Sequence, residues 1–112
     1  MIYVIDSYTV PESIGNVVGA KTEELAKKLT AYWRKRWPET DPKVIRNITG
    51  DTTRISWIYK VKSVAEMEPF AKAIVEDSGM KALLDEWSAA EKVVGSLLIT
   101  QPKREYYSVL AE

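Results

Sequence analysis

The sequence predicts a single α+β domain whose strands and helices follow the order βαββαβ. Residues 43–61 form two stretches of alternating apolar and polar residues around Gly50-Asp51, a dipeptide typical of tight hairpin turns. Apolar residues at helical spacing flank this hairpin on both sides, and strand-like segments lie near both ends of the chain. At 112 residues the chain has the length of one domain, which we place at residues 1–112.

The first part of the chain predicts one strand and one long helix. Residues 2–10 alternate so that both faces carry apolar side chains, as expected for a central strand, and Pro11 ends this strand. Residues 16–37 place apolar side chains at helical spacing, and Pro38 stops the helix.

The hairpin that follows predicts a sheet with two unlike faces. Because side chains alternate along a strand, loops of two residues (50–51) and of four (50–53) give the same faces. The apolar face, which should pack on the helices, holds Val44, Arg46, Ile48, Ile55, Trp57 and Tyr59. The opposite face is mixed and holds Ile45, Asn47, Thr49, Arg54, Ser56, Ile58 and Lys60.

The second part of the chain predicts a helix in two pieces. Residues 63–66 (SVAE) match a capping box, in which Ser and Glu side chains satisfy the first backbone N–H groups. Residues 77–79 should break the helix. The inward positions are expected to be Met67, Phe70, Ala71, Ile74 and Val75 in the first piece, and Met80, Leu83, Leu84, Trp87 and Ala90 in the second.

Two strand-like segments end the chain. Residues 96–100 are the expected fourth strand at a sheet edge, and residues 105–110, after a turn at 101–103, are an extra C-terminal strand. The predicted edge carries the apolar run 97–99, which invites aggregation unless something covers it. A second copy of the chain is the natural cover, so the sequence favours a homodimer.

Composition excludes several classes of function. The chain has no Cys and no His, which excludes disulfides, thiol nucleophiles, a Ser-His-Asp triad and the usual ligands of haem and zinc. We therefore expect no cofactor and no transition metal. Basic and acidic residues number 16 each, so charge gives no support for binding nucleic acid or an anionic membrane. With no signal peptide and no membrane-spanning run, we expect a cytoplasmic protein.

Four segments resemble the dimeric α/β-barrel superfamily, and within it the small NIPSNAP-like and antibiotic-biosynthesis-monooxygenase-like proteins. They are residues 8–11 (YTVP), 46–51 (RNITGD), 54–57 (RISW) and 95–96 (GS), and the resemblance extends over nearly the whole chain. The resemblance implies ferredoxin-like protomers, with an antiparallel sheet, that pair sheet to sheet as a dimeric α/β barrel. Some members are oxygenases without metal or flavin, some bind haem, and many have no known role. The C-terminal strand is an addition to that pattern.

Arg46 is the most suggestive single residue. It falls on the apolar hairpin face beside Trp57 and Tyr59, where a guanidinium must either be paired or bind an anionic or carbonyl group. The structural interpretation is an ion pair with Asp6 or Glu24, and the functional interpretation is a ligand site.

The aromatic residues and the polar stripe also allow two interpretations each. Trp33, Trp57 and Tyr59, with Tyr32 and Trp87, could line a pocket for a flat ligand or could simply form the core. Asn47 and its polar neighbours could form a central ligand site or the hydrogen bonds of a dimer interface.

Our leading hypothesis is a homodimer that binds a small aromatic ligand, as a cofactor-independent monooxygenase or isomerase acting on an aromatic or polyketide-like substrate. Arg46 would hold a substrate oxygen, Tyr59 would hydrogen-bond it, and Trp57 and Trp33 would stack on it. The alternative is a structural or interaction dimer whose barrel is filled by side chains. An RNA-recognition motif shares the element order but needs a basic-Gly-aromatic consensus that this chain lacks. The sequence identifies no catalytic residue and leaves open whether the protein is an enzyme.

Overall fold

The computed structural model describes residues 1–9, 15–46, 54–93 and 103–111, and it has the expected α+β order. The elements are β1 (Ile2–Thr9), α1 (Gly15–Arg36), η2 (Pro38–Thr40), β2 (Lys43–Arg46), β3 (Arg54–Val61), η3 (Val64–Glu66), α2 (Met67–Glu76), α3 (Ser78–Val93) and β4 (Lys103–Ser108).

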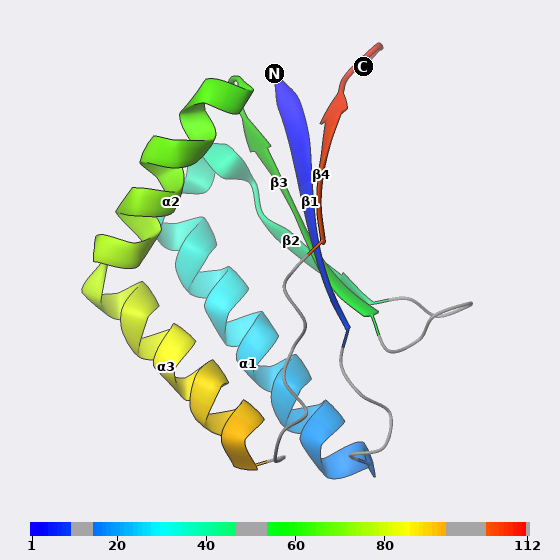
Figure 1. The fold of residues 1–112 in the computed structure, drawn as a ribbon, viewed down its shortest axis with the longest axis vertical. Coiled ribbons are helices and arrows are strands. Elements are labelled where there is room, and N and C mark those ends of the chain that lie inside the picture. The colour runs from blue at the N-terminus through cyan, green and yellow to red at the C-terminus, as the bar shows by residue number, and fades with distance from the viewer. Residues whose placement is uncertain (10–14, 47–53, 94–102, 112) are drawn as a thin grey trace.

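The four strands form one antiparallel sheet with the order β2-β3-β1-β4 (Figure 1). This is the ferredoxin-like arrangement, and β1 is central, as its two apolar faces predicted. Asp6 in the middle of β1 lies opposite Trp57 of β3 on one side and opposite Arg104 of β4 on the other. Side chains from both ends of the chain therefore meet on one face of the sheet.

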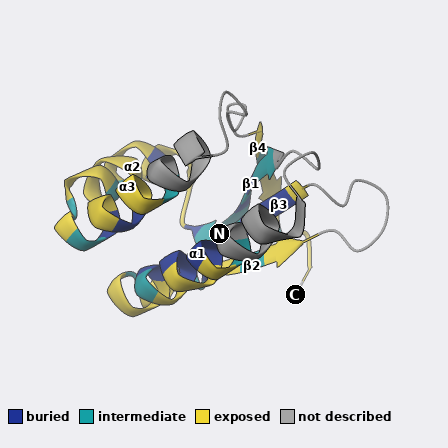
Figure 2. Cartoon of the chain, turned by 90° about the horizontal axis from the view of Figure 1, so that it is seen from below, coloured by how far each residue is buried: buried dark blue, intermediate teal, exposed yellow. Residues whose placement is uncertain are grey.

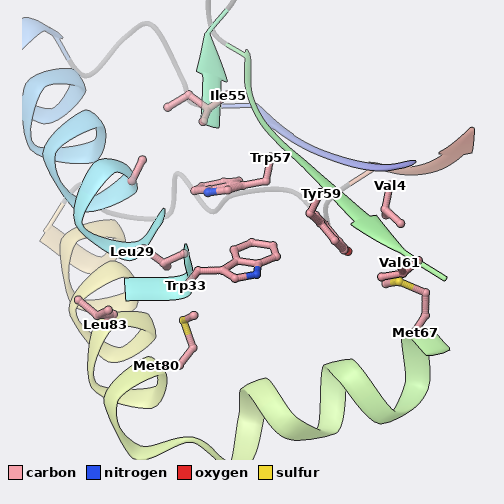
Figure 3. Packing of buried hydrophobic residues seen from close by; sticks show 11 residues of the cluster. Val4, Leu29, Trp33, Ile55, Trp57, Tyr59, Val61, Met67, Met80 and Leu83 are labelled. Atoms are coloured by element: carbon pink, nitrogen blue, oxygen red, sulfur yellow. The ribbon is translucent and has the colours of Figure 1, made fainter. Parts of the chain in front are cut away.

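The three helices lie on one side of the sheet (Figures 1 and 2). The core fills the space between them, and Figure 3 shows the rings of Trp33, Trp57 and Tyr59 at its centre. The apolar hairpin face thus packs on the helices, as predicted. Among the helices that the structure describes, none is both long and apolar enough to cross a membrane.

Among the described residues, the strand that pairs with the free edge of β1 is the C-terminal segment. The C-terminal segment, as β4, pairs with β1 and takes the place expected for residues 96–100. It is the fourth strand among the described residues, and it pairs within its own protomer. Residues 96–100, with the apolar run 97–99, lie outside the described residues, as does the hairpin turn.

The second part of the chain differs in detail from the prediction. The helical pieces separate at Asp77 as expected, but the capping box does not form, because neither Ser63 nor Glu66 makes a side-chain cap. Of the expected inward residues, Met67, Met80 and Leu83 are buried and Phe70, Ile74 and Trp87 partly so. Ala71, Val75 and Leu84 are exposed, so α2 buries a narrower stripe than predicted.

Asp77 explains why the helix breaks where it does. Its Oδ2 accepts hydrogen bonds from the Tyr32 hydroxyl at 2.5 Å and from the backbone N–H of Met80 at 2.9 Å, which caps the first turn of α3. Its Oδ1 accepts from Nε of Arg36 at 3.0 Å. A Cβ on Gly79 would overlap the ring and hydroxyl of Tyr32, so a larger residue at position 79 would displace Tyr32 from its place against α3.

Candidate functional site

Arg46 does not occupy the buried position that the sequence predicted. It lies at the end of the edge strand β2, opposite Ile55, with 49% of its side chain exposed. Its Nη1 donates to Oε1 of Glu23 on α1 at 2.7 Å, so its partner is neither Asp6 nor Glu24. A long side chain on an edge strand can carry its charge to water along apolar neighbours, which is why the face was predicted correctly and the depth was not.

The predicted aromatic residues come together, but as part of the core. The ring centroids of Trp33 and Tyr59 are 4.8 Å apart, and Trp57 packs edge-on against Tyr8 at 5.3 Å and Trp87 at 5.7 Å. All three predicted rings are buried. The remaining predicted ligand residue, Asn47, lies outside the described residues.

Both buried indoles are satisfied within the fold. Nε1 of Trp57 donates to Oγ1 of Thr30 at 3.0 Å, and Nε1 of Trp33 donates to Oγ1 of Thr40 at 2.9 Å. Because each indole N–H has a protein acceptor, neither is left for a ligand. These contacts favour the structural interpretation of Trp33 and Trp57.

A polar cluster of Asp6, Tyr59 and Arg104 lies on the same helix-facing side, toward the β4 edge. Nε and Nη2 of Arg104 donate to Oδ1 and Oδ2 of Asp6 at 2.7 and 2.9 Å, a two-pronged contact that fixes both planar groups. The Tyr59 hydroxyl donates to the same Oδ2 at 3.0 Å. The carboxylate thus accepts three hydrogen bonds from residues far apart in the sequence.

The electrostatics of this cluster keep Tyr59 neutral and Arg104 charged. Burial raises the pKa of the Tyr59 hydroxyl far above its ordinary range, and the neighbouring Asp6 charge raises it further. The hydrogen bonds to Asp6 raise the pKa of the Arg104 guanidinium, which therefore stays charged. Tyr59 is consequently a neutral donor that is committed to Asp6, and it is unsuited to proton transfer near neutral pH.

The cluster is buried on one side and open on the other. The Asp6 side chain is 10% exposed, whereas that of Arg104 is 40% exposed. Tyr8 follows Asp6 on the same face of β1, and the exposed Tyr106 follows Arg104 on the same face of β4. The arrangement can offer a planar cation, flanked by aromatic rings, to an oxygen acceptor.

Sequence reasoning missed Arg104 because it placed the turn at 101–103 and began the strand at Glu105, whereas β4 begins at Lys103. Asp6 itself carried a signal, since it alternates with Val4 and Tyr8 on a buried face of a central strand. A carboxylate in such a position requires a charged or hydrogen-bonding partner. The position of Asp6 therefore predicts that it has a hydrogen-bonding partner, but it does not identify the strand that carries this partner.

The face of the sheet away from the helices is mixed, as predicted. Ser56 is buried there, and its hydroxyl lies 2.9 Å from that of Ser7 across the β1–β3 ladder. Lys60 lies beside Asp41, with 3.8 Å between Nζ and Oδ2. Ile45 and Tyr107 are exposed on this face, and Tyr3, Ile5 and Ile58 are partly exposed.

Comparison with known proteins establishes the fold. No family model and no curated protein matches the sequence. Among solved structures, a NIPSNAP family protein from Agrobacterium tumefaciens superposes with a TM-score of 0.68 and 11% identity, covering 96% of this chain and 92% of its own. A candidate antibiotic biosynthesis monooxygenase from Deinococcus radiodurans gives 0.60 and 11%, covering 100% and 95%.

A third structure is a variant of SnoaB, a cofactor-independent oxygenase from Streptomyces nogalater. It gives a TM-score of 0.58 and 14% identity, covering 99% of this chain and 94% of its own. Sequence identities of 11–14% to these structures indicate a shared fold and do not indicate a shared function. The resemblance seen in the sequence is thus confirmed at the level of the fold: the chain has the ferredoxin-like fold of these proteins over almost its whole length.

Proposed function

We propose that the protein binds a small, flat molecule with an acceptor oxygen, on the helix-facing side of the sheet beside Arg104. The observation that carries this proposal is the asymmetry of the Asp6–Arg104 pair, whose carboxylate is buried while its guanidinium reaches solvent. Arg104 takes the role that the sequence hypothesis gave to Arg46, because Arg46 points to the α1 surface and pairs with Glu23.

A purely structural purpose explains this pair less well. A buried ion pair contributes little net stability, because desolvation of the charges offsets much of their attraction, and well-packed apolar residues often serve better. Asp6 nevertheless holds Arg104 in one fixed orientation through two hydrogen bonds. Fixing the orientation of a cation before the ligand arrives lowers the entropic cost of binding, which supports a recognition role.

For an activity, we propose cofactor-independent oxidation or isomerisation of an aromatic or polyketide-like substrate. SnoaB, which shares the fold, is a cofactor-independent oxygenase. Such a substrate supplies its own electrons: a methylene group and O₂ give a carbonyl group and water. Arg104 would stabilise negative charge on the substrate oxygen while a water molecule takes a proton from the adjacent carbon.

The second candidate is a structural or interaction dimer, which the packed and hydrogen-bonded indoles of Trp33 and Trp57 favour. Under either candidate, a second copy of the chain would cover the mixed sheet face with its partly exposed Ile5 and Ile58. Light scattering should then give the mass of a dimer at micromolar concentration, and the mass of a monomer would contradict this assembly.

The proposed function is tested by thermal shift with a panel of flat aromatic compounds, neutral and anionic. A ligand at about a hundred times its Kd stabilises the native state by about 2.7 kcal/mol, which raises the melting temperature measurably. At least one member should raise it, and the rise should shrink in Arg104→Gln but persist in Arg46→Gln. If every member leaves the melting temperature unchanged, the dimer without a ligand is favoured.

A further inference from the structure

We infer that the molecule bound beside Arg104 is an anion, with a carboxylate, phenolate or enolate oxygen conjugated to a flat ring system. This inference rests on the proposed function and narrows it, since a flat neutral carbonyl compound would satisfy the proposed function equally well. It follows from which groups of the cluster are already satisfied and which are not.

Arg104 keeps N–H donors that its neighbours in the cluster do not use. Its contacts to Asp6 take Nε–H and one Nη2–H, and the side chain of Tyr106 also hydrogen-bonds the guanidinium, which leaves further N–H donors on the same planar group. Its side chain is 40% exposed, so these donors can be reached from solvent. The partner of such donors is an acceptor, and a charged acceptor forms the shorter and stronger hydrogen bond.

Asp6 and Tyr59 do not contact the ligand directly, because their polar groups are already bonded within the cluster. The Tyr59 hydroxyl is committed to Asp6 and is held in its neutral form by burial. Asp6 has both oxygens occupied and is itself 10% exposed, so its charge is compensated locally. Among the described residues, Asp6 is the one carboxylate for which a hydrogen bond to Arg104 is observed, and it lies on the buried side of the guanidinium.

Two tyrosines near Arg104 determine the shape of the ligand that fits beside it. Tyr106 lies two residues along β4 from Arg104 on the same face, and it is exposed. Tyr8 lies two residues from Asp6 on β1 and is partly exposed, with its ring packed against Trp57. Aromatic surfaces beside a planar cation favour a flat ligand whose ring stacks while its anionic group meets the guanidinium.

The test uses 2-naphthoate and 2-naphthamide, which have the same ring and nearly the same shape but differ in charge. Their Kd values are measured by titration calorimetry on wild type, Arg104→Lys, Arg46→Gln and the double variant Asp6→Asn/Arg104→Gln. The double variant removes both charges together, so that no buried charge is left without its partner if Arg104→Gln alone fails to fold. Arg46→Gln is the matched control, because it removes one arginine charge at the opposite edge of the sheet.

Wild type and Arg46→Gln should bind naphthoate more tightly than naphthamide by roughly tenfold or more, the ratio that one charge-assisted hydrogen bond supplies. The ratio should fall in Arg104→Lys and approach one in the double variant. Equal affinities in wild type, or a ratio that survives in the double variant, would overturn the inference. If neutral members of the panel bind and naphthoate does not, this inference fails and the proposed function stands. If no compound binds at all, both fail.

Discussion

The two edges of the sheet each send an arginine to the helix-facing side, and the two arginines are held in opposite ways. Arg46 on β2 makes one contact with Glu23, and both side chains are close to half exposed. Arg104 on β4 makes a two-pronged contact with the buried Asp6, which also accepts from Tyr59. The residue type and the face are the same in both cases.

The difference lies in what the neighbouring strand places opposite each arginine. Arg46 lies opposite Ile55, which offers no acceptor, so its side chain turns to the surface of α1. Arg104 lies opposite Asp6 and is held down on the sheet. The role of a charged residue on a strand is therefore set by its cross-strand neighbour more than by the apolar residues beside it in sequence.

The sharpest test of this comparison removes the acceptor at each edge. Asp6→Ala leaves the buried Tyr59 hydroxyl without an acceptor and Arg104 without its partner, so we expect a loss of about 2–3 kcal/mol in the free energy of unfolding. Glu23→Ala, the matched control, should cost about 0.5 kcal/mol or less. Urea denaturation measures both, and equal losses at the two positions would show that the two pairs do not differ in the way described.

The sequence predicts much of the fold that surrounds these two arginines. Alternation in residues 43–61 and the helical spacing around them predict the order of the elements and the face of the sheet that packs on the helices. The two apolar faces of residues 2–10 predict the central position of β1. The sequence does not predict which C-terminal segment fills the β4 edge, because both segments look like strands and pairing with β1 joins residues almost a chain length apart.

The candidate site was harder to predict than the fold for the same reason. The sequence predicted that Tyr59 and Arg46 would lie together on the helix-facing side. The structure places Tyr59 in a contact with Asp6 and places Arg46 against Glu23. Alternation gives the face of a side chain, while its partner depends on the register between strands 98 residues apart, as for Asp6 and Arg104. Local pattern carries no information on that register.

Tyr59→Phe isolates the third member of the buried cluster. It removes one of the three donors to Asp6 without opening a large cavity, so we expect a loss of about 1–1.5 kcal/mol near neutral pH. The raised pKa of Tyr59 adds a pH dependence, because its contribution is full below the unfolded pKa of about 10 and is lost as pH rises above it. Wild type should therefore lose stability more steeply than Tyr59→Phe in alkaline urea titrations, and parallel curves would contradict the assignment.

Arg36 provides an intermediate case between the two edges. Its side chain is 59% exposed, but its partner Asp77 is 11% exposed and also accepts from Tyr32 and the backbone of Met80. The hydrogen bond from Tyr32 is the first cause that lowers the pKa of Asp77, and the contacts from Met80 and Arg36 lower it as well.

A lowered pKa means that Asp77 contributes stability above its unfolded pKa, and that this contribution is lost as pH falls below about 4. Asp77→Asn should lower the melting temperature at neutral pH by less than Asp6→Ala does. It should also make the melting temperature fall less steeply as the pH is lowered below about 4. A fall as steep as that of wild type would show that Asp77 is not the group that titrates.

The smallest expected effect is that of Arg46→Met, which keeps much of the side-chain volume and removes the charge. Had Arg46 been a buried structural ion pair, the change would cost about 3–5 kcal/mol, because a buried carboxylate would lose its partner. With 49% and 42% of the two side chains exposed, water solvates Glu23 when the arginine is gone, so we expect a change within about 0.5 kcal/mol of zero. High salt should reduce even this difference, since exposed ion pairs are screened. Urea denaturation of Arg46→Met at low and high salt measures it, with Arg104→Met as the comparison that should lose several times more. A loss at position 46 as large as that at position 104 would mean that the β2 edge depends on its ion pair as strongly as the β4 edge depends on Asp6.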